Sequence, residues 1–168
     1  MKYQKLIKAW LEHKEWTDEA THDEETNQSV VSFSVGINNQ SFSTYLEGDG
    51  KKDWLSLFMY APFNVKKEKE AEILKLFNHI HSSTYFGHLV LLNDGRIHYK
   101  QIISLDKTDP SLEALDAIFD TAVLVYERYL DGLTEIALTK TTFDQWEVQW
   151  EKENSPQTWF PWNPVPYQ

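Results

Sequence analysis

The sequence predicts an α+β domain in which helices pack on an antiparallel sheet of about five strands. The first observation is the order of periodicities along the 168 residues. Helical and strand-like stretches alternate as α-β-β-β-α-β-β-α. The second is that the strands within each group are joined by short turns, which give antiparallel neighbours. The third is that each helix has one apolar stripe, and a sheet face is the surface on which such stripes can be buried.

The first helix is predicted over residues 3–14. Its apolar residues recur at helical spacing, with lysine and glutamate between them, and they are Tyr3, Leu6, Ile7, Trp10 and Leu11. The segment that follows, residues 17–28, is rich in acidic side chains and has almost no apolar ones. It is therefore expected to be a solvated linker.

Three strands are predicted after this segment. "SVVSFSVGI" and "SFSTYLE" alternate apolar and small or polar residues, and Asn38-Asn39 between them suits a tight turn. "GDGKKD" makes the next turn. The third run, "WLSLFMY" at 54–60, is apolar at consecutive positions. Such a run is typical of a central strand covered on both faces, and Pro62 is expected to end it.

A second helix is predicted from Lys66 to about Ser82, followed by the hairpin "GHLVLLNDGRIHYKQIISL". Asp94-Gly95 between two apolar runs suits a two-residue type I′ turn, which pairs Asn93 with Arg96. The register then follows by counting. It places Leu92 opposite Ile97 and Val90 opposite Tyr99 on one face, and Leu91 opposite His98 and Leu89 opposite Lys100 on the other.

A long final helix is predicted behind Asp109 and Pro110, which suit an N-cap and a first helical position. Apolar residues keep helical spacing for about seven turns. They are Leu112, Leu115, Ile118, Phe119, Ala122, Val123, Tyr126, Tyr129, Leu130, Leu133, Ile136 and Ala137. The acidic residues between them, such as Asp116 and Asp120, are expected on a solvated face, with an acidic docking surface as the alternative.

Composition restricts the partners of this chain. The net charge is −10, from 16 Lys and Arg against 26 Asp and Glu. This field repels a phosphate backbone and an anionic membrane surface, so neither nucleic acid nor membrane is an expected partner. The absence of cysteine excludes a thiolate nucleophile and cysteine-ligated metal sites. The amino terminus lacks the apolar run of a signal peptide, which makes the cytoplasm the expected compartment.

Histidines are the natural candidates for metal binding or catalysis, because four of them lie between residues 79 and 98. His79 and His81 are two apart on a helix and so point in different directions. The predicted hairpin register places His88 and His98 on opposite faces of the sheet. No metal or other cofactor is therefore expected. The chain also lacks the common hydrolase, metalloprotease and nucleotide-binding motifs, so it is not expected to be an enzyme.

One row of basic residues stands out against the acidic background. Arg96, His98 and Lys100 project from the same side of one predicted strand, and the register places Leu89 and Leu91 beside them. A face of mixed basic and apolar character suits a protein partner. The alternatives are a solvated sheet face or one that faces the acidic segment of the same chain.

The chain ends in "TWFPWNPVPYQ", which can be neither an ordinary helix nor a central strand. Its prolines favour polyproline II, whose three-residue period puts Trp159, Trp162 and Val165 in one row. An exposed row of this kind is an aggregation hazard. It either packs back on the sheet or the long helix, together with Trp146 and Trp150, or enters a groove on another subunit or protein.

The order of elements, with "LLNDGRIHYKQIISL" followed by "SLEALDAIFDTAVLVYERYLDGLTEI", resembles the YbjN-type bacterial sensory transduction regulators. The resemblance runs from about Val30 to Ile136. It implies a fold like that of the type III secretion chaperones and a small, non-catalytic protein that binds other proteins. Residues 1–142 would form this domain, and residues 143–168 an aromatic and proline-rich tail outside the pattern.

The expected function is therefore that of a cofactor-free cytoplasmic regulator or chaperone-like adaptor that binds a protein partner, with homodimerisation left open. The alternative is a small enzyme that uses a cleft lined by histidine and carboxylates. A deep pocket with three or more titratable groups would favour the enzyme. A flat apolar face with a polar rim would favour the binding protein.

Overall fold

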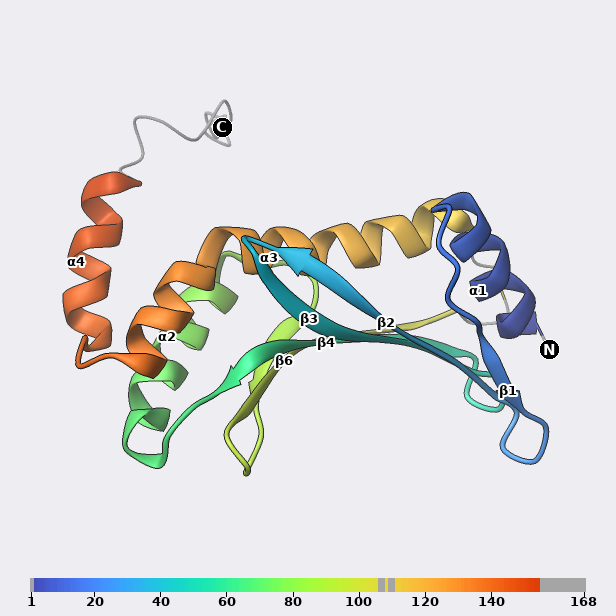
Figure 1. Ribbon diagram of the computed structural model, residues 1–168, viewed down its shortest axis with the longest axis horizontal. Helices are drawn as coiled ribbons and strands as arrows, with labels where there is room; N and C mark the ends of the chain where they lie inside the picture. Colours follow the sequence, from blue (N-terminus) through green and yellow to red (C-terminus); the bar gives the residue numbers. More distant parts are fainter. Residues whose placement is uncertain (1, 106–107, 109–110, 155–168) are drawn as a thin grey trace, which may run out of the picture.

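The computed structural model describes residues 2–105, 108 and 111–154. It shows an α+β fold with one sheet and helices packed on it (Figure 1). The elements in chain order are α1 (Lys2–His13), β1 (Thr21–Asp23), β2 (Gln28–Ile37), β3 (Gln40–Asp49), β4 (Trp54–Asn64), the 3₁₀ turn η1 (Lys67–Lys69), α2 (Glu70–Ser83), β5 (His88–Leu91), β6 (Arg96–Ser104), α3 (Leu112–Leu138) and α4 (Phe143–Glu153).

The sheet has six antiparallel strands in the order β1-β2-β3-β4-β6-β5. The predicted class is confirmed, with one strand more than the sequence indicated. The additional strand is β1, which lies within the segment predicted to be a solvated linker and pairs Thr21 with Val30. Its residues are polar and largely exposed because it forms the outer edge of the sheet. Backbone pairing holds it there, with side-chain hydrogen bonds from Thr21 to the Val30 carbonyl (3.2 Å) and between His22 and Ser29 (2.9 Å). These polar contacts need no hydrophobic pattern.

The helices cover one face of the sheet. In Figure 1, α3 runs along the upper side of the sheet, α1 closes one end, and α2 and α4 lie at the other end. Tyr3, Ile7 and Trp10 of α1 are buried, as is every second residue of β4 from Leu55 to Met59. These side chains and the inner stripe of α3 form one core. None of the described helices has the length and apolar character of a membrane span.

Strand β4 is central, as predicted, but it is covered on one face only. Leu55, Leu57 and Met59 are buried in the core, while Phe58 and Tyr60, which point the other way, are half-buried. The strand also continues through Pro62 to Asn64, with a shift of register after Tyr60. A proline is tolerated there because an irregularity in the ladder removes the need for its missing N–H.

The register predicted for the β5–β6 hairpin is wrong by one residue. The amide of Leu92 donates to the carbonyl of Arg96 (2.8 Å), so the loop contains three residues rather than two. Gly95 has a φ of +84°, as expected for a type I turn followed by a left-handed glycine. Leu89 consequently faces Tyr99 and Leu91 faces Ile97. Because side chains alternate, this slip moves both leucines to the core face.

The long helix α3 is confirmed, and it begins at Leu112 with Ser111 as N-cap rather than Asp109. The Ser111 side chain accepts a hydrogen bond from the amide of Ala114 (3.3 Å). Asp109 and Pro110 lie outside the described residues. Most of the predicted apolar stripe is buried, although Leu112 and Val123 are only partly covered, and Val125 and Gly132 join the buried face.

Asp116 is not part of a solvated face. Its carboxylate accepts a hydrogen bond from the Trp10 indole (2.8 Å) and pairs with Lys14 (2.7 Å). These interactions, the hydrogen bond to Lys14 first, lower the pKa of the Asp116 carboxyl. Asp116 therefore links α3 to α1, and its carboxylate is not free to bind a partner.

The segment predicted to begin the tail forms a further helix, α4. Thr142 and Gln145 make a capping box, in which each side chain bonds the backbone of the other residue. Trp146 is buried against Gly132 of α3, where an added Cβ would lie 2.5 Å from the indole nitrogen. Trp146 and Trp150 of α4 thus pack on the long helix α3. This is one of the two arrangements that the sequence predicts for these tryptophans.

Candidate protein-binding surface

The sheet face opposite the helices, here called the open face, carries a cluster of aromatic rings. Phe58 and Tyr60 of β4 lie between Tyr45 of β3 and His98 of β6. The Tyr45 and Tyr60 rings meet edge to face with centroids 5.8 Å apart. The His98 ring lies 5.0 Å from Tyr60 and 5.5 Å from Phe58. Four aromatic side chains therefore form one continuous patch across three strands.

His98 is the buried centre of this patch, with 7% of its surface exposed. Neither ring nitrogen has a hydrogen-bond partner in the part of the chain that the structure describes. Burial, assisted by the charges of Lys100, Arg96 and His88, lowers the pKa of His98. The imidazole is consequently neutral near pH 7, with one nitrogen able to donate and one able to accept.

The predicted basic row is found on the open face. Arg96 is exposed and its guanidinium lies over the Tyr60 ring at 5.6 Å, while Lys100 is half-buried beside Phe58. The corrected register adds His88, which pairs with Lys100 and so shares this face. It also places His88 and His98 on the same face, contrary to the prediction. Leu89, with 3% exposure, and Leu91 belong to the core side and leave the candidate surface.

The aromatic patch continues toward the far ends of the strands. Trp54 and Ile102 are about two-fifths exposed, at 39% and 41%. They line a shallow hollow of about 160 Å³ together with Glu47. Burial raises the pKa of the Glu47 carboxyl, and Lys52 lies over the Trp54 ring at 5.2 Å. On the other side of the patch, β2 and β3 present a rim of exposed serines, namely Ser32, Ser34, Ser41 and Ser43.

The remaining histidines point to separate surroundings. His79 lies against Trp146 of α4 (5.4 Å between rings) and near the Glu147 carboxylate (3.5 Å). His81 accepts a hydrogen bond from the amide of Leu89 (2.9 Å), and burial lowers its pKa. Among the described residues, no group of three or more His, Asp or Glu side chains is arranged to hold a metal ion.

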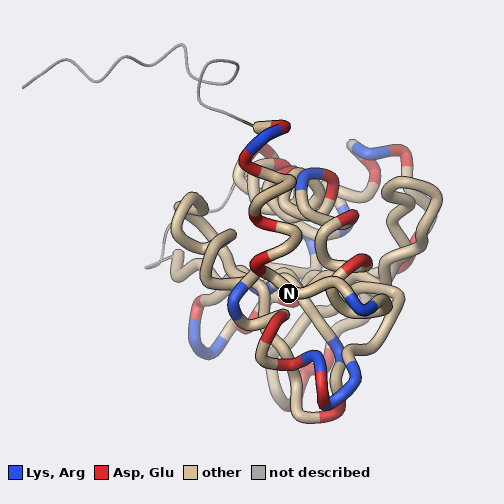
Figure 2. The backbone as a smooth tube through the Cα atoms, turned by 90° about the vertical axis from the view of Figure 1, so that its left-hand side faces the viewer, with Lys and Arg blue, Asp and Glu red and all other residues tan. Residues whose placement is uncertain are grey.

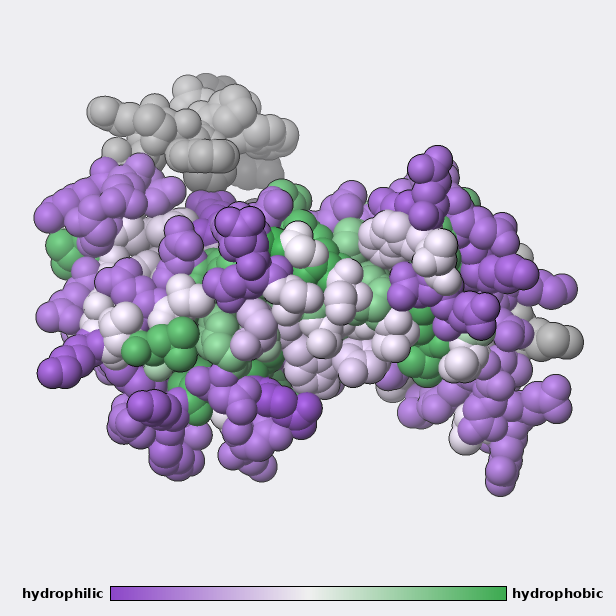
Figure 3. All heavy atoms as spheres, viewed as in Figure 1, coloured by the Kyte–Doolittle hydropathy of each residue, from purple (hydrophilic) through white to green (hydrophobic). Residues whose placement is uncertain are grey.

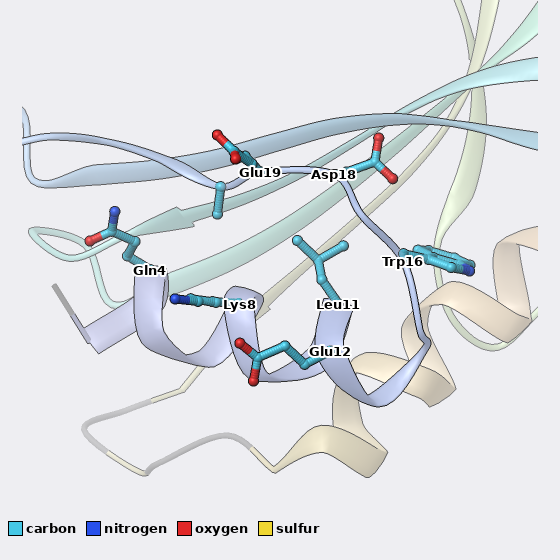
Figure 4. A pocket seen from close by; sticks show the side chains of 8 residues that line it. Gln4, Lys8, Leu11, Glu12, Trp16, Asp18 and Glu19 are labelled. Atoms are coloured by element: carbon cyan, nitrogen blue, oxygen red, sulfur yellow. The ribbon is translucent and has the colours of Figure 1, made fainter.

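A pocket of about 360 Å³ lies between α1 and the segment leading to β1. Figure 4 shows Leu11 pointing from α1 toward this segment, while the carboxylates of Asp18 and Glu19 point away from the helix. Lys8 and Glu12 are also exposed. The titratable groups therefore stand around the rim in water, whereas Leu11 and Trp16 provide the apolar lining. This arrangement gives a general acid or base no enclosed position in which to act.

Charges of both signs alternate over the molecule. Figure 2, which views the end where α2 and α4 lie, shows Lys and Arg positions interspersed with Asp and Glu positions along the backbone. Figure 3 shows apolar side chains gathered over the middle of α3 and beside α2, between hydrophilic ends. Trp159, Trp162 and Val165, the tail residues predicted to bind a partner, lie outside the described residues.

The fold, with helices on one side of an antiparallel sheet, is similar to that of chains in two solved complexes. The chain resembles a chain of the HopA1–SchA chaperone–effector complex, with 19% identity, a TM-score of 0.51 and coverage of 76% of this chain and 91% of that one. A chain of the ExsC–ExsE complex gives 14% identity, a TM-score of 0.53 and coverage of 77% and 93%. The predicted type III secretion chaperone-like fold is confirmed.

The family follows from the sequence match. Residues 4–135 match the YbjN family, described as "Putative bacterial sensory transduction regulator". The chain belongs to this family, as the resemblance implied. The structure of YbjN from E. coli is also similar, with 10% identity, a TM-score of 0.49 and coverage of 75% of this chain and 89% of that one. No curated protein matches the chain significantly.

Proposed function

We propose that the protein is a non-catalytic regulator or chaperone-like adaptor, acting in the cytoplasm, that binds a protein partner on the open face of its sheet. The observation that carries the proposal is the aromatic patch around His98. In a folded domain, aromatic rings on an uncovered sheet face suit a buried interface centre, because tyrosine and tryptophan give large contact area with few rotatable bonds.

The charges around the patch indicate what kind of segment fits it. Lys100 borders one side, next to Arg96, whose guanidinium also pairs with Asp94 (2.8 Å). A segment with a carboxylate near its apolar residues would be attracted to this side. The surface therefore favours a mixed acidic and apolar segment over a purely apolar one.

The similar structures support this proposal at the level of fold. Two of them are chains of complexes, one described as a chaperone with its effector. A second copy of the chain is the other protein that could cover the open face, and it would make the protein a homodimer. Sedimentation of the wild-type protein and of a Tyr60→Lys variant distinguishes this case, because a lysine in the patch would dissociate such a dimer.

Site-specific photocrosslinking in native lysate tests the proposal. A photoreactive residue at Tyr45, on the open face, should give a discrete adduct that disappears when Tyr60→Lys is added. The same residue at Leu138, which is 58% exposed on α3, should not give that adduct. Equal adducts from both positions, or none from Tyr45, would contradict a partner surface on the open face.

A further inference from the structure

A second uncovered apolar surface lies on the helical side of the molecule. Tyr85 and Phe86, in the segment between α2 and β5, are 95% and 67% exposed, and Leu124 on α3 is 62% exposed. They border a groove of about 260 Å³ that Tyr129 and Arg128 also line. We call it the α3 groove. Three large apolar side chains around one hollow favour an occupant, because such a patch in water promotes association.

The chemistry of the α3 groove is aromatic with one cation. Trp150 of α4 stacks on Tyr129 with ring centroids 5.1 Å apart. The guanidinium of Arg128 lies over both rings, at 5.4 Å from Tyr129 and 5.7 Å from Trp150. Grooves lined by aromatic rings bind proline-rich segments in the polyproline II conformation, because the rings pack on the flat, already ordered segment.

Helix α4 packs on α3 beside this groove, because Trp150 contacts Tyr129 and Arg128, which both line it. Trp146 lies on Gly132 and Trp150 lies on Tyr129, so successive turns of α4 meet α3 progressively nearer to Leu124. Asn154, whose side-chain amide donates to the carbonyl of Trp150 (3.0 Å), is one turn further on. Residues 155–168 follow Asn154 in the sequence. Fourteen residues in the polyproline II conformation could span up to about 43 Å.

The composition of residues 155–168 matches the groove. The segment has four prolines and no charged side chain in a chain of net charge −10. Burying it therefore desolvates no ionised side chain. Its predicted row of Trp159, Trp162 and Val165 offers one apolar side, and the prolines limit the entropy lost on binding. A tethered segment also has an effective concentration of about millimolar, which favours it over a second copy.

We propose that residues 155–168 bind in the α3 groove of their own chain, with the row of Trp159, Trp162 and Val165 against Tyr85, Phe86 and Leu124. The groove is formed by α3 and the segment before β5, whereas the partner surface is formed by β3, β4 and β6. The proposal is therefore independent of the proposed function, and each can fail without the other.

Disulfide trapping in the full chain tests this, because the natural sequence has no cysteine. Cysteines at Leu124 and Val165 should form an intramolecular disulfide about tenfold faster than cysteines at Glu127 and Val165, given the local concentration that binding produces. Glu127 is exposed on the adjacent turn and does not line the groove. Equal rates for the two pairs would overturn the proposal. A disulfide between two chains would also overturn it and assign the groove to a second copy.

Indole NMR signals give a second measurement that does not depend on cysteine placement. The signals of Trp159 and Trp162 should be dispersed in the wild-type protein and should move to random-coil positions in Leu124→Lys. The control Leu138→Lys, an exposed leucine elsewhere on α3, should leave them unchanged. Random-coil positions in the wild type, or equal changes in both variants, would overturn binding in the groove.

Discussion

The hydroxyl of Tyr126 donates a hydrogen bond to the backbone carbonyl of Met59, over 2.8 Å. The same hydroxyl accepts from the amide of Tyr99 (3.1 Å), the residue paired with Met59 in the β4–β6 ladder. One buried phenol from α3 therefore joins the two central strands from the core side. The other face of these two strands carries Tyr60 and His98.

Tyr126→Phe should lower the free energy of unfolding by about 1 to 3 kcal/mol, because it leaves buried backbone groups without their partner. Urea denaturation measures the change. Tyr45→Phe is the matched control, since Tyr45 is 37% exposed and its hydroxyl remains accessible to water. A Tyr126→Phe protein as stable as the control would show that the two bonds contribute nothing to the fold.

Phe119→Ala should cost about 3 to 5 kcal/mol, the usual range for truncating a buried aromatic ring. Phe119 packs against Trp10, Trp16 and Phe33, with centroids 5.7, 5.4 and 6.1 Å away. It thus joins α3 to α1 and to β2. The denaturation midpoint should fall strongly, whereas Leu138→Ala, at an exposed position, should barely move it. Equal midpoints for the two variants would mean that this aromatic cluster is not part of the core.

Gly132→Ala should destabilise the docking of α4, although alanine is the better helix former by about 1 kcal/mol. The added methyl group would lie 2.5 Å from the Trp146 indole nitrogen, and the rings of His79, Phe143 and Trp150 leave that indole little room to move. The melting temperature and the indole NMR signal of Trp146 report the effect. Gly36→Ala is the control, since no atom lies within 4 Å of the added Cβ. A stabilised Gly132→Ala protein would refute close packing of α4 on α3.

The stability of the protein should fall as the pH drops from about 7 to 5, and His98 should contribute to that loss. In the folded state the pKa of His98 is lowered by burial, whereas an unfolded histidine has a pKa of about 6.5. Below that value the unfolded chain binds a proton that the folded chain does not, so acid favours unfolding. In His98→Phe the loss should be smaller. His13→Phe, at an exposed position, is the control, and an unchanged pH dependence in His98→Phe would contradict the buried neutral imidazole.

The sequence predicts the helices and the fold class well because their signals are long. The apolar stripe of α3 extends over many turns, so a few irregular positions such as Leu112 do not obscure it. The three polar residues of β1 have no such pattern, because an edge strand needs only backbone pairing. The sequence does contain a signal for helix α4, namely the capping box of Thr142 and Gln145 before apolar residues. The prolines further along the chain favour an irregular tail instead.

The candidate surface was predicted in part. Arg96, His98 and Lys100 share a face whatever the hairpin register, because they alternate along one strand. The prediction for Leu89 and Leu91 is wrong, because a two-residue loop and a three-residue loop can both end in glycine. The two loops shift the pairing of the strands by one residue, and this shift moves each side chain to the opposite face. The sequence does not identify Phe58 and Tyr60 as surface residues. A strand that is apolar at consecutive positions has the same pattern whether its second face is buried in the core or covered by a partner.

Affinity for the partner identified by crosslinking tests the central proposal most directly. Titration calorimetry with purified partner should show that Tyr60→Ala binds about thirtyfold or more weakly than the wild type, since truncating an interface aromatic costs about 2 kcal/mol or more. Leu138→Ala should bind as the wild type does. If Tyr60→Ala, with an unchanged melting temperature, retained wild-type affinity, the open face would not be the partner surface.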